Sequence, residues 1–315
     1  MTSNDTAKKR RLTKSERSAR KDKIVSFIVL FIAALFFVFP LVYMIGTSLK
    51  TTNDIELNPG GLFPSAGEWT LKHYSTFFFN ENTGKADQLP FWIINSLWSS
   101  FASVGLTVIF DLMIAYAVVF LKFKGKNTLV KFLTLWMAVP GVIGTAPAYA
   151  MFASVKNSLE ISGGVGGYIY AYFWIIMPGI SGIFNMLLMR NFFASIPVDI
   201  IDSAKSDGAS HMTIFRRIVI PLAKSTIMLI VLFSFVGAWN NLIWPQLVLA
   251  GTGQGEVNYW NTVTVGLTDW TQGKGRDMIG MAMAGSVFTM IPIVIIFIFT
   301  QNKMIDGLAS TGIKM

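Results

Sequence analysis

Few residues of this chain are of a type that performs acid–base, nucleophilic or metal chemistry. The sequence contains no cysteine and only two histidines, His73 and His211. The lack of cysteine excludes disulfides, thiolate metal sites and a cysteine nucleophile. Two histidines are also too few for most histidine-ligated metal sites. We therefore expect no catalytic residues, no metal site and no cofactor bound by this chain.

One carboxylate stands inside an apolar run, Asp111 in Phe110-Asp111-Leu112. An ionisable residue within a membrane segment is costly, so it is by default a candidate for function. The alternative is a structural acceptor whose hydrogen bonds come from a neighbouring helix. The sequence leaves both interpretations open.

Side chains suited to binding a sugar occur in other apolar segments. Sugars are bound by aromatic faces together with amide groups that form hydrogen bonds. The alternative is structural, because tryptophan marks membrane interfaces and asparagine holds membrane helices together. The candidates for a solute pathway are Trp239, Asn240, Asn241 and Trp244, which form the densest cluster, and the isolated Asn95 and Asn185.

These residues must be positioned by long apolar elements. The 315 residues are 53% hydrophobic and 14% charged, with a mean hydropathy of +0.54, whereas soluble domains are about 25% charged. A helix needs about 20 apolar residues to cross a membrane. The six candidate spans are Ile24–Leu49, Phe91–Leu121, Leu129–Val155, Gly166–Met189, Thr226–Ala250 and Met278–Gln301. We predict an all-α, polytopic membrane protein with six transmembrane helices.

The basic residues are distributed unevenly between the connecting segments. The arm 1–23, the turn after the second span, the loop 191–224 with Arg190, and the tail 303–315 carry 20 Lys and Arg residues, and the alternate segments carry 6. Cytoplasmic segments are enriched in Lys and Arg. We therefore predict that both termini and the loop are cytoplasmic and flank a membrane domain over 24–302. The net charge of +9 then needs no nucleic acid. The polar arm is expected to be disordered or to lie on the membrane surface.

The cytoplasmic loop 191–224 has the pattern of two helices separated by a sharp turn. Pro197 can begin a helix, and Asp199 and Asp202 suit the positive end of its dipole. Gly208 supplies a C-terminal turn, and a second apolar and basic stretch follows. A structured, partly apolar loop indicates docking onto a soluble partner. The alternative is an amphipathic helix on the lipid surface.

The loop reads Asp202-Ser203-Ala204-x-x-Asp207-Gly208-Ala209, followed by Ile218-x-x-Pro221-Leu222. This pattern resembles the EAA loop of permease subunits in binding-protein-dependent ABC importers. With Asn95-Ser96-Leu97, Ala115-Tyr116-Ala117 and Trp239-Asn240-Asn241-x-x-Trp244-Pro245, the chain resembles the second permease subunit of maltose-type oligosaccharide importers. Asp202-Ser203 replaces the Glu-Ala that is more frequent in this family.

The resemblance implies a permease that moves a carbohydrate, and in this branch of the family an oligosaccharide, into a bacterial cell through its inner membrane by alternating access. The implied partners are a second homologous permease, two cytoplasmic ATPase subunits that hold ATP and magnesium, and an extracellular solute-binding protein. The outer loop 251–277 would reach that protein. The residues implied in coupling to the ATPases are Asp202, Ala204, Asp207, Gly208, Ala209, Arg216 and Pro221.

Other functions remain as alternatives. The loop pattern is also compatible with an ABC permease for a solute other than a sugar. An ion-coupled secondary transporter would show inverted repeats and charged pairs near the membrane midplane, and Asp111 is the one such charge in the spans. A membrane-embedded enzyme would need acid–base or metal ligands facing the membrane. The sequence contains no Gly-x-x-x-x-Gly-Lys-Ser/Thr phosphate loop, so we expect ATP to be hydrolysed by partner subunits.

Overall fold

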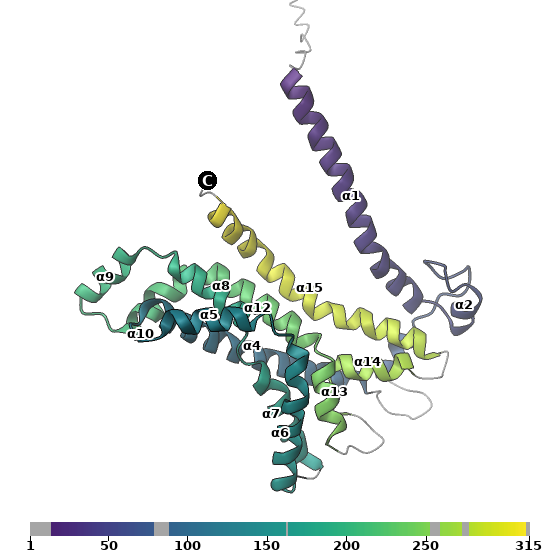
Figure 1. Ribbon diagram of the computed structural model, residues 1–315. Helices are drawn as coiled ribbons and strands as arrows, with labels where there is room; N and C mark the ends of the chain where they lie inside the picture. Colours follow the sequence, from purple (N-terminus) through teal and green to yellow (C-terminus); the bar gives the residue numbers. More distant parts are fainter. Residues whose placement is uncertain (1–13, 79–87, 162, 253–258, 273–276, 313–315) are drawn as a thin grey trace, which may run out of the picture. The chain divides into compact units, whose positions relative to one another are not determined.

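The computed structural model describes residues 14–78, 88–161, 163–252, 259–272 and 277–312 (Figure 1). Within these ranges the elements are helical, and the one β interaction is an isolated bridge between Lys50 and Trp69. The prediction of an all-α fold is therefore confirmed. The chain divides into two units, Met1–Leu71 and Lys72–Met315.

The first unit contains α1 (Lys14–Ser48) and α2 (Thr52–Leu57). Disorder was one of two expectations for the basic arm, but residues 14–23 are the start of α1, and residues 1–13 lie outside the described part. After α1 the chain folds around two buried charged residues. The Lys50 Nζ donates to the carbonyl oxygens of Asn58, at 2.6 Å, and Gly61, at 2.8 Å.

The carboxylate of Asp54 holds the next turn of this segment. It accepts hydrogen bonds from the hydroxyl of Ser65, at 2.6 Å, and from the backbone N–H of Ser65, at 3.0 Å. These bonds, with the nearby charge of Lys50, hold the pKa of Asp54 below its ordinary value of 3.8 against the opposing effect of burial. Charged groups can be buried when they are paired or hydrogen-bonded in this way.

The second unit is a helical assembly around α4 (Leu89–Phe120), which packs against α7, α8, α12 and α14. The remaining elements, in chain order, are α3 (Lys72–Phe78), α5 (Lys126–Trp136), η1 (Gly141–Gly144), α6 (Thr145–Ser158), α7 (Gly164–Ile176), η2 (Met177–Gly179), α8 (Ile183–Ala194), α9 (Val198–Ser206), α10 (His211–Ile214), the π-helical turn η3 (Phe215–Val219), α11 (Ile220–Leu222), α12 (Lys224–Trp239), α13 (Ile243–Ala250), α14 (Val263–Gln272) and α15 (Asp277–Gly312). The tail beyond residue 302 thus continues α15 up to Gly312.

Three helices are long and apolar enough to cross a membrane alone, within residues 20–48, 89–120 and 279–302. Three further pairs pass the same test only when each bent pair is taken together, so the described residues provide up to six spans. The predicted third span bends by 97° between α5 and η1–α6, and the predicted fourth by 46° between α7–η2 and α8. The predicted fifth span, Thr226–Ala250, consists of two helices, because α12 ends at Trp239 and α13 begins at Ile243.

A proline lies close to two of these breaks. A proline leaves the carbonyl four residues before it without its helical donor, and within a membrane another group must satisfy that carbonyl. Pro178 frees the carbonyl of Trp174, which accepts from the indole N–H of Trp244 at 2.7 Å. Pro245 frees the carbonyl of Asn241, which accepts from the hydroxyl of Thr264 at 2.9 Å. Hydrogen bonds between elements therefore support the broken backbone.

Candidate functional site: a structured loop and a polar cavity

The first half of the loop is the short helix α9, which ends in a Schellman motif. Gly208 has φ of +80°, and its N–H donates to the carbonyl of Lys205 at 2.9 Å. The N–H of Ala209 donates to the carbonyl of Ala204 at 3.0 Å. This pair of bonds defines the motif, which favours glycine at the left-handed position. The spacing Ala204-x-x-x-Gly208-Ala209 therefore has a structural cause.

The second half of the loop contains a widened helical turn. Ser210 caps α10, because its hydroxyl accepts from the N–H of Thr213 at 3.2 Å. In the following turn the N–H of Ile220 bonds to the carbonyl of Phe215, five residues back. Such π-type turns are rare and accommodate an irregularity in a helix. Here the irregularity is Pro221, whose ring cannot continue a regular α-helix.

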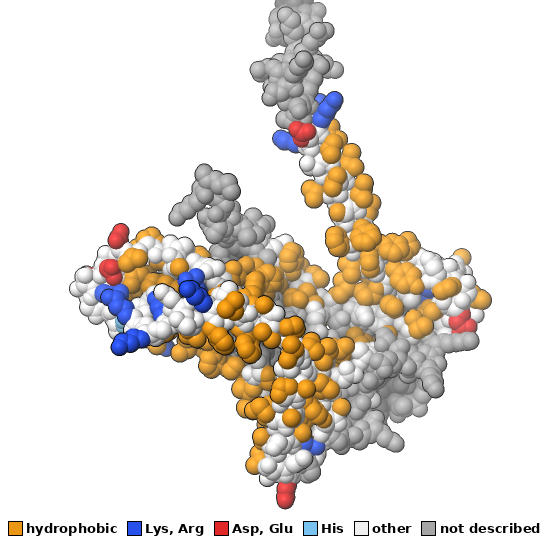
Figure 2. Space-filling model, in the orientation of Figure 1, with side chains coloured by type: hydrophobic (Ala, Val, Ile, Leu, Met, Phe, Trp, Pro, Cys, Tyr) orange, Lys and Arg blue, Asp and Glu red, His pale blue; other side chains and the backbone are white. Residues whose placement is uncertain are grey.

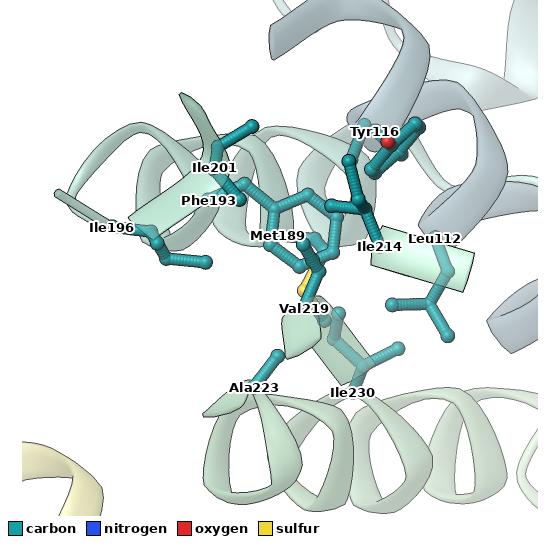
Figure 3. Packing of buried hydrophobic residues seen from close by; sticks show 11 residues of the cluster. Leu112, Tyr116, Met189, Phe193, Ile196, Ile201, Ile214, Val219, Ala223 and Ile230 are labelled. Atoms are coloured by element: carbon teal, nitrogen blue, oxygen red, sulfur yellow. The ribbon is translucent and has the colours of Figure 1, made fainter. Parts of the chain in front are cut away.

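The inner face of the loop is packed into a core with three membrane helices, α4, α8 and α12 (Figure 3). Ile201 and Ile214 of the loop are buried, as are Tyr116 of α4 and Phe193 of α8. The whole cluster consists of Leu112, Ala115, Tyr116, Met189, Phe193, Ile196, Ile201, Ile214, Val219, Ala223 and Ile230. Protein interiors of this kind are close-packed and transmit displacement. A force on the loop therefore acts directly on α4, α8 and α12.

Tyr116 also ties the loop to α4 by polar contacts. Its hydroxyl lies 3.1 Å from Nδ1 of His211 and 3.1 Å from the carbonyl oxygen of His211. One arrangement satisfies both distances: the hydroxyl donates to the carbonyl and accepts from an Nδ1–H. The Ala115-Tyr116-Ala117 motif thus contributes Tyr116 to the attachment of the loop.

The outer face of the loop is exposed and mixes charge with apolar surface. Asp202, Asp207 and Gly208 are exposed, and Asp202 pairs with Lys205 at 3.2 Å. Ile200 and Met212 are 43% and 51% exposed. Figure 2 shows Lys and Arg side chains gathered at this end of the second unit, beside long hydrophobic surfaces. Arg216 and Pro221 are also exposed, whereas Ala204 and Ala209 are partly buried against the cluster.

The second candidate feature is a cavity of about 590 Å³ between α4, η1–α6, η2–α8 and α12–α13. Volumes of about 300–1,000 Å³ are typical of small-molecule sites. Its polar lining consists of hydroxyl and amide side chains, and Trp244 and Phe233 supply aromatic surface. These polar residues are Ser99, Ser100, Ser103, Thr107, Thr145, Asn185, Ser234 and Asn241.

The cavity brings together only part of the predicted solute pathway. Asn185, Asn241 and Trp244 line it. Trp239 does not, because it is 1% exposed, stacks on Phe235 and donates its indole N–H to the carbonyl of Thr289 at 3.1 Å. Asn240 is exposed at the end of α12 and is not a lining residue either.

Asn95, the remaining candidate, holds the base of the outer loop. Its side-chain NH₂ group donates to the carbonyls of Tyr259, at 2.8 Å, and Asn261, at 3.2 Å, and its oxygen accepts from the hydroxyl of Tyr168 at 2.8 Å. The other end of the loop is held where Lys156 Nζ donates to the carbonyl of Gly251 at 2.6 Å. Residues 253–258 and 273–276 of this loop lie outside the described part.

Asp111 is fully buried and accepts hydrogen bonds from the segment that interrupts the helix between α7 and α8. Its carboxylate accepts from the hydroxyl of Ser181 at 2.7 Å and from the N–H of Gly182 at 3.4 Å. One turn earlier on α4, the hydroxyl of Thr107 donates to the carbonyl of Gly179 at 3.2 Å. The geometry favours the structural alternative, in which Asp111 satisfies irregular backbone. No group of three or more potential metal ligands occurs among the described residues.

The residues that the sequence analysis missed form a stripe along α4. Ser99, Ser103 and Thr107 recur every four residues between Asn95 and Asp111, and residues four apart lie on one face of a helix. The middle of the stripe lines the cavity, while its two ends hold the outer loop and the α7–α8 break. Polar residues that recur every four positions in an otherwise apolar helix are a pattern in the sequence that could have indicated this stripe.

The chain is similar in sequence and in fold to known transport proteins. A family model for the "Binding-protein-dependent transport system inner membrane component" matches residues 108–302. The chain is 30% identical to the diacetylchitobiose uptake system permease DasC of Streptomyces coelicolor, over 92% of this chain and 95% of the relative. It is 28% identical to the arabinooligosaccharides transport system permease AraQ of Halalkalibacterium halodurans, over 88% and 91%. A solved bacterial ABC transporter that imports the acidic polysaccharide alginate aligns with a TM-score of 0.72 at 20% identity, covering 93% of this chain and 99% of that chain.

Proposed function

The chain belongs to the family of binding-protein-dependent transport system inner membrane components, and from this premise we propose that it is one permease subunit of an ATP-driven carbohydrate importer. Its relatives DasC and AraQ are named as permeases for diacetylchitobiose and for arabinooligosaccharides. The cavity supplies hydroxyl, amide and tryptophan surface of the kind that binds sugars. The transported solute is accordingly a carbohydrate, and an oligosaccharide in particular.

The observation that carries this proposal is the position of α4 between the loop and the cavity. Ser99 and Thr107 of α4 line the cavity, and Leu112 and Tyr116 of the same helix pack against the loop. A displacement of the loop is thus passed along one helix to the cavity wall. Transport by alternating access requires such a two-state element, biased by a ligand on another chain.

The partners follow from the two surfaces. Of two cytoplasmic ATPase subunits, which hold ATP and magnesium, one would dock against Asp202, Asp207, Gly208 and the neighbouring apolar residues of the loop's outer face. A second, homologous permease would complete the cavity. A solute-binding protein outside the cell would deliver the carbohydrate to the outer loop, whose ends are held by Asn95 and Lys156.

The orientation is proposed from charge. The segments assigned to the cytoplasm carry 20 Lys and Arg residues against 6 on the other side, which places both termini and the loop inside the cell. The chain is then a multi-pass protein of the bacterial inner membrane, with the loop on the side where ATP is available.

The test is reconstitution of the assembled transporter, with ATP hydrolysis measured as the solute-binding protein and a panel of oligosaccharides are added. Hydrolysis should rise when the binding protein carries its sugar. Asp207→Arg, which reverses charge on the outer face of the loop, should reduce this rise together with sugar uptake. The matched control is Glu160→Arg, which makes the same charge change at the far end of α6. Unchanged uptake in Asp207→Arg would contradict the proposed docking surface.

A further inference from the structure

The cavity differs from the rest of the second unit in the type of its polar groups. All eight polar side chains that line it are hydroxyls or amides, and no Asp, Glu, Lys, Arg or His is among the described lining residues. Hydroxyls and primary amides both donate and accept hydrogen bonds. They match a solute that presents many hydroxyl groups and carries no charge.

Several of these groups have spare hydrogen-bonding capacity. The side-chain amide of Asn241 makes no hydrogen bond within the described chain, since only its backbone groups are bonded. Asn185 donates its NH₂ group to the hydroxyl of Ser234 at 3.0 Å, which leaves its carbonyl oxygen available. The hydroxyls of Ser100 and Ser103 are likewise not bonded to described residues. Polar groups inside a membrane need partners, and a polyhydroxylated solute supplies them.

A buried carboxylate beside the cavity would repel an anion. The carboxylate of Asp111 binds the N–H of Gly182 at 3.4 Å, and Gly182 itself lines the cavity. Asp111 accepts hydrogen bonds from Ser181 and Gly182 and has no cationic partner in the described chain. An anionic solute would therefore lose its hydration and find no compensating positive charge, which is a strongly unfavourable exchange.

We propose that this cavity admits uncharged, polyhydroxylated solutes and excludes anionic ones, with Asn185, Asn241 and Trp244 as residues that contact the solute. The inference rests on the proposed function as an importer and narrows its substrate class. The comparisons alone do not give this distinction, because the transporter with the similar fold imports an acidic polysaccharide. Such specificity has two sources: favourable hydrogen bonds with the correct solute, and the free-energy cost of leaving the charge of an anionic solute unpaired in the cavity.

The test is direct binding to the complete transporter in nanodiscs, without its solute-binding protein, so that the permease alone discriminates. The probes are N,N′-diacetylchitobiose, arabinotriose and the matched pair α-1,4-galactotriose and trigalacturonate, in which each ring has a hydroxymethyl group or a carboxylate, respectively, at C6. Saturation-transfer NMR should detect binding of the neutral probes. The signal of trigalacturonate should be at least about tenfold weaker than that of galactotriose, because placing its carboxylates near a like charge or without a cationic partner costs several kcal/mol. Equal signals from the matched pair, or no signal from any probe, would overturn the inference.

A pair of variants tests whether the cavity residues are responsible. Asn241→Lys places a cation in the cavity and should raise the ratio of trigalacturonate to galactotriose signal by about tenfold. Asn240→Lys adds the same charge one residue away, outside the lining, and should leave the ratio at the wild-type value. An unchanged ratio in Asn241→Lys would overturn the role of Asn241. Stimulation of ATP hydrolysis by the solute-binding protein is measured separately, and its loss would count against the import function instead.

Discussion

At the scale of single residues, buried charge in this protein is used to hold irregular backbone. Asp111 binds the break between α7 and α8, Lys50 binds two carbonyls after α1, and Asp54 binds Ser65. Each group pairs with backbone or side-chain polar groups that would otherwise be left without a hydrogen bond. Substitution of these residues should therefore lower the stability of the fold, and any effect on transport should follow from that loss.

Asp111→Ala should destabilise the transporter. The substitution leaves the Ser181 hydroxyl and the Gly182 N–H without their acceptor, and an unsatisfied buried group costs about 1–3 kcal/mol. Asp111→Asn keeps one acceptor oxygen and should give an intermediate loss. The measurement is thermal unfolding of the purified complex in detergent. A melting temperature for Asp111→Ala equal to that of the wild type would show that the carboxylate does not support the break.

Asp54 makes the segment that follows α1 sensitive to acid. Because the pKa of Asp54 is lowered in the folded state, its contribution to stability is complete above the unfolded pKa of about 3.9 and is lost as pH falls through the lower folded value. Hydrogen exchange across residues 50–70, corrected for intrinsic rates, should show protection lost below about pH 4. Ser65→Ala removes the strongest cause of the shift and should move this loss to higher pH. A profile that the variant does not change would contradict the assignment.

At the scale of elements, two glycines stand where an added side chain would disturb the structure. Gly208 is required by its backbone angle alone, since a Cβ there would meet nothing within 4 Å. Gly266 is required by packing, because a Cβ there would overlap the ring of the buried Trp92. The first position tests the shape of the loop, and the second tests the contact between α14 and α4.

Gly208→Val should abolish transport while the protein still inserts into the membrane. A β-branched residue at φ of +80° is strained, so the Schellman turn and the placement of Asp207 would be lost. Gly208→Asn is the matched control, because asparagine tolerates the left-handed region. Uptake and ATP hydrolysis of the reconstituted complex are the measurements. Equal activity in both variants would show that the turn is not needed for coupling.

Gly266→Ala should separate α14 from α4. Overpacking a close contact costs about 1–3 kcal/mol, and here the added methyl meets the rigid ring of Trp92. Gly105→Ala on α4 is the control, because a Cβ at Gly105 meets nothing within 4 Å. Thermal unfolding should distinguish the two variants by several degrees. If both unfold at the wild-type temperature, the contact between α14 and α4 is not close in the assembled protein.

Much of the architecture could be predicted from the sequence, and the reasons for the exceptions are physical. Apolar length predicted the spans, and Pro197 and Gly208 predicted the helix and turn of the loop. The break at Asn240 was missed because its stabilising donor, Thr264, lies far along the chain. Trp239 was assigned to the solute pathway because residue type does not reveal which face of a helix is buried.

At the scale of the whole molecule, the proposed orientation is directly testable because the chain has no cysteine. Ser206→Cys in the loop and Gly60→Cys after α1 introduce single labels at exposed positions. In intact cells a membrane-impermeant maleimide should label the Gly60 variant, and it should label the Ser206 variant only after the membrane is opened. The cysteine-free parent is the control. The opposite pattern would invert the topology and place the loop out of reach of ATP.

The broken helices have a consequence for how the solute preference of such a protein can change. Gly141, Gly144, Gly179 and Gly182 line the cavity where spans are interrupted, so peptide groups form part of the surface that a solute meets. A library of side-chain substitutions leaves those groups in place and samples only the remaining surface. Insertions, deletions or relocated prolines, which move the interruptions themselves, would reach the rest. Variation in the position of the breaks is thus a route to new substrates that point mutagenesis would overlook.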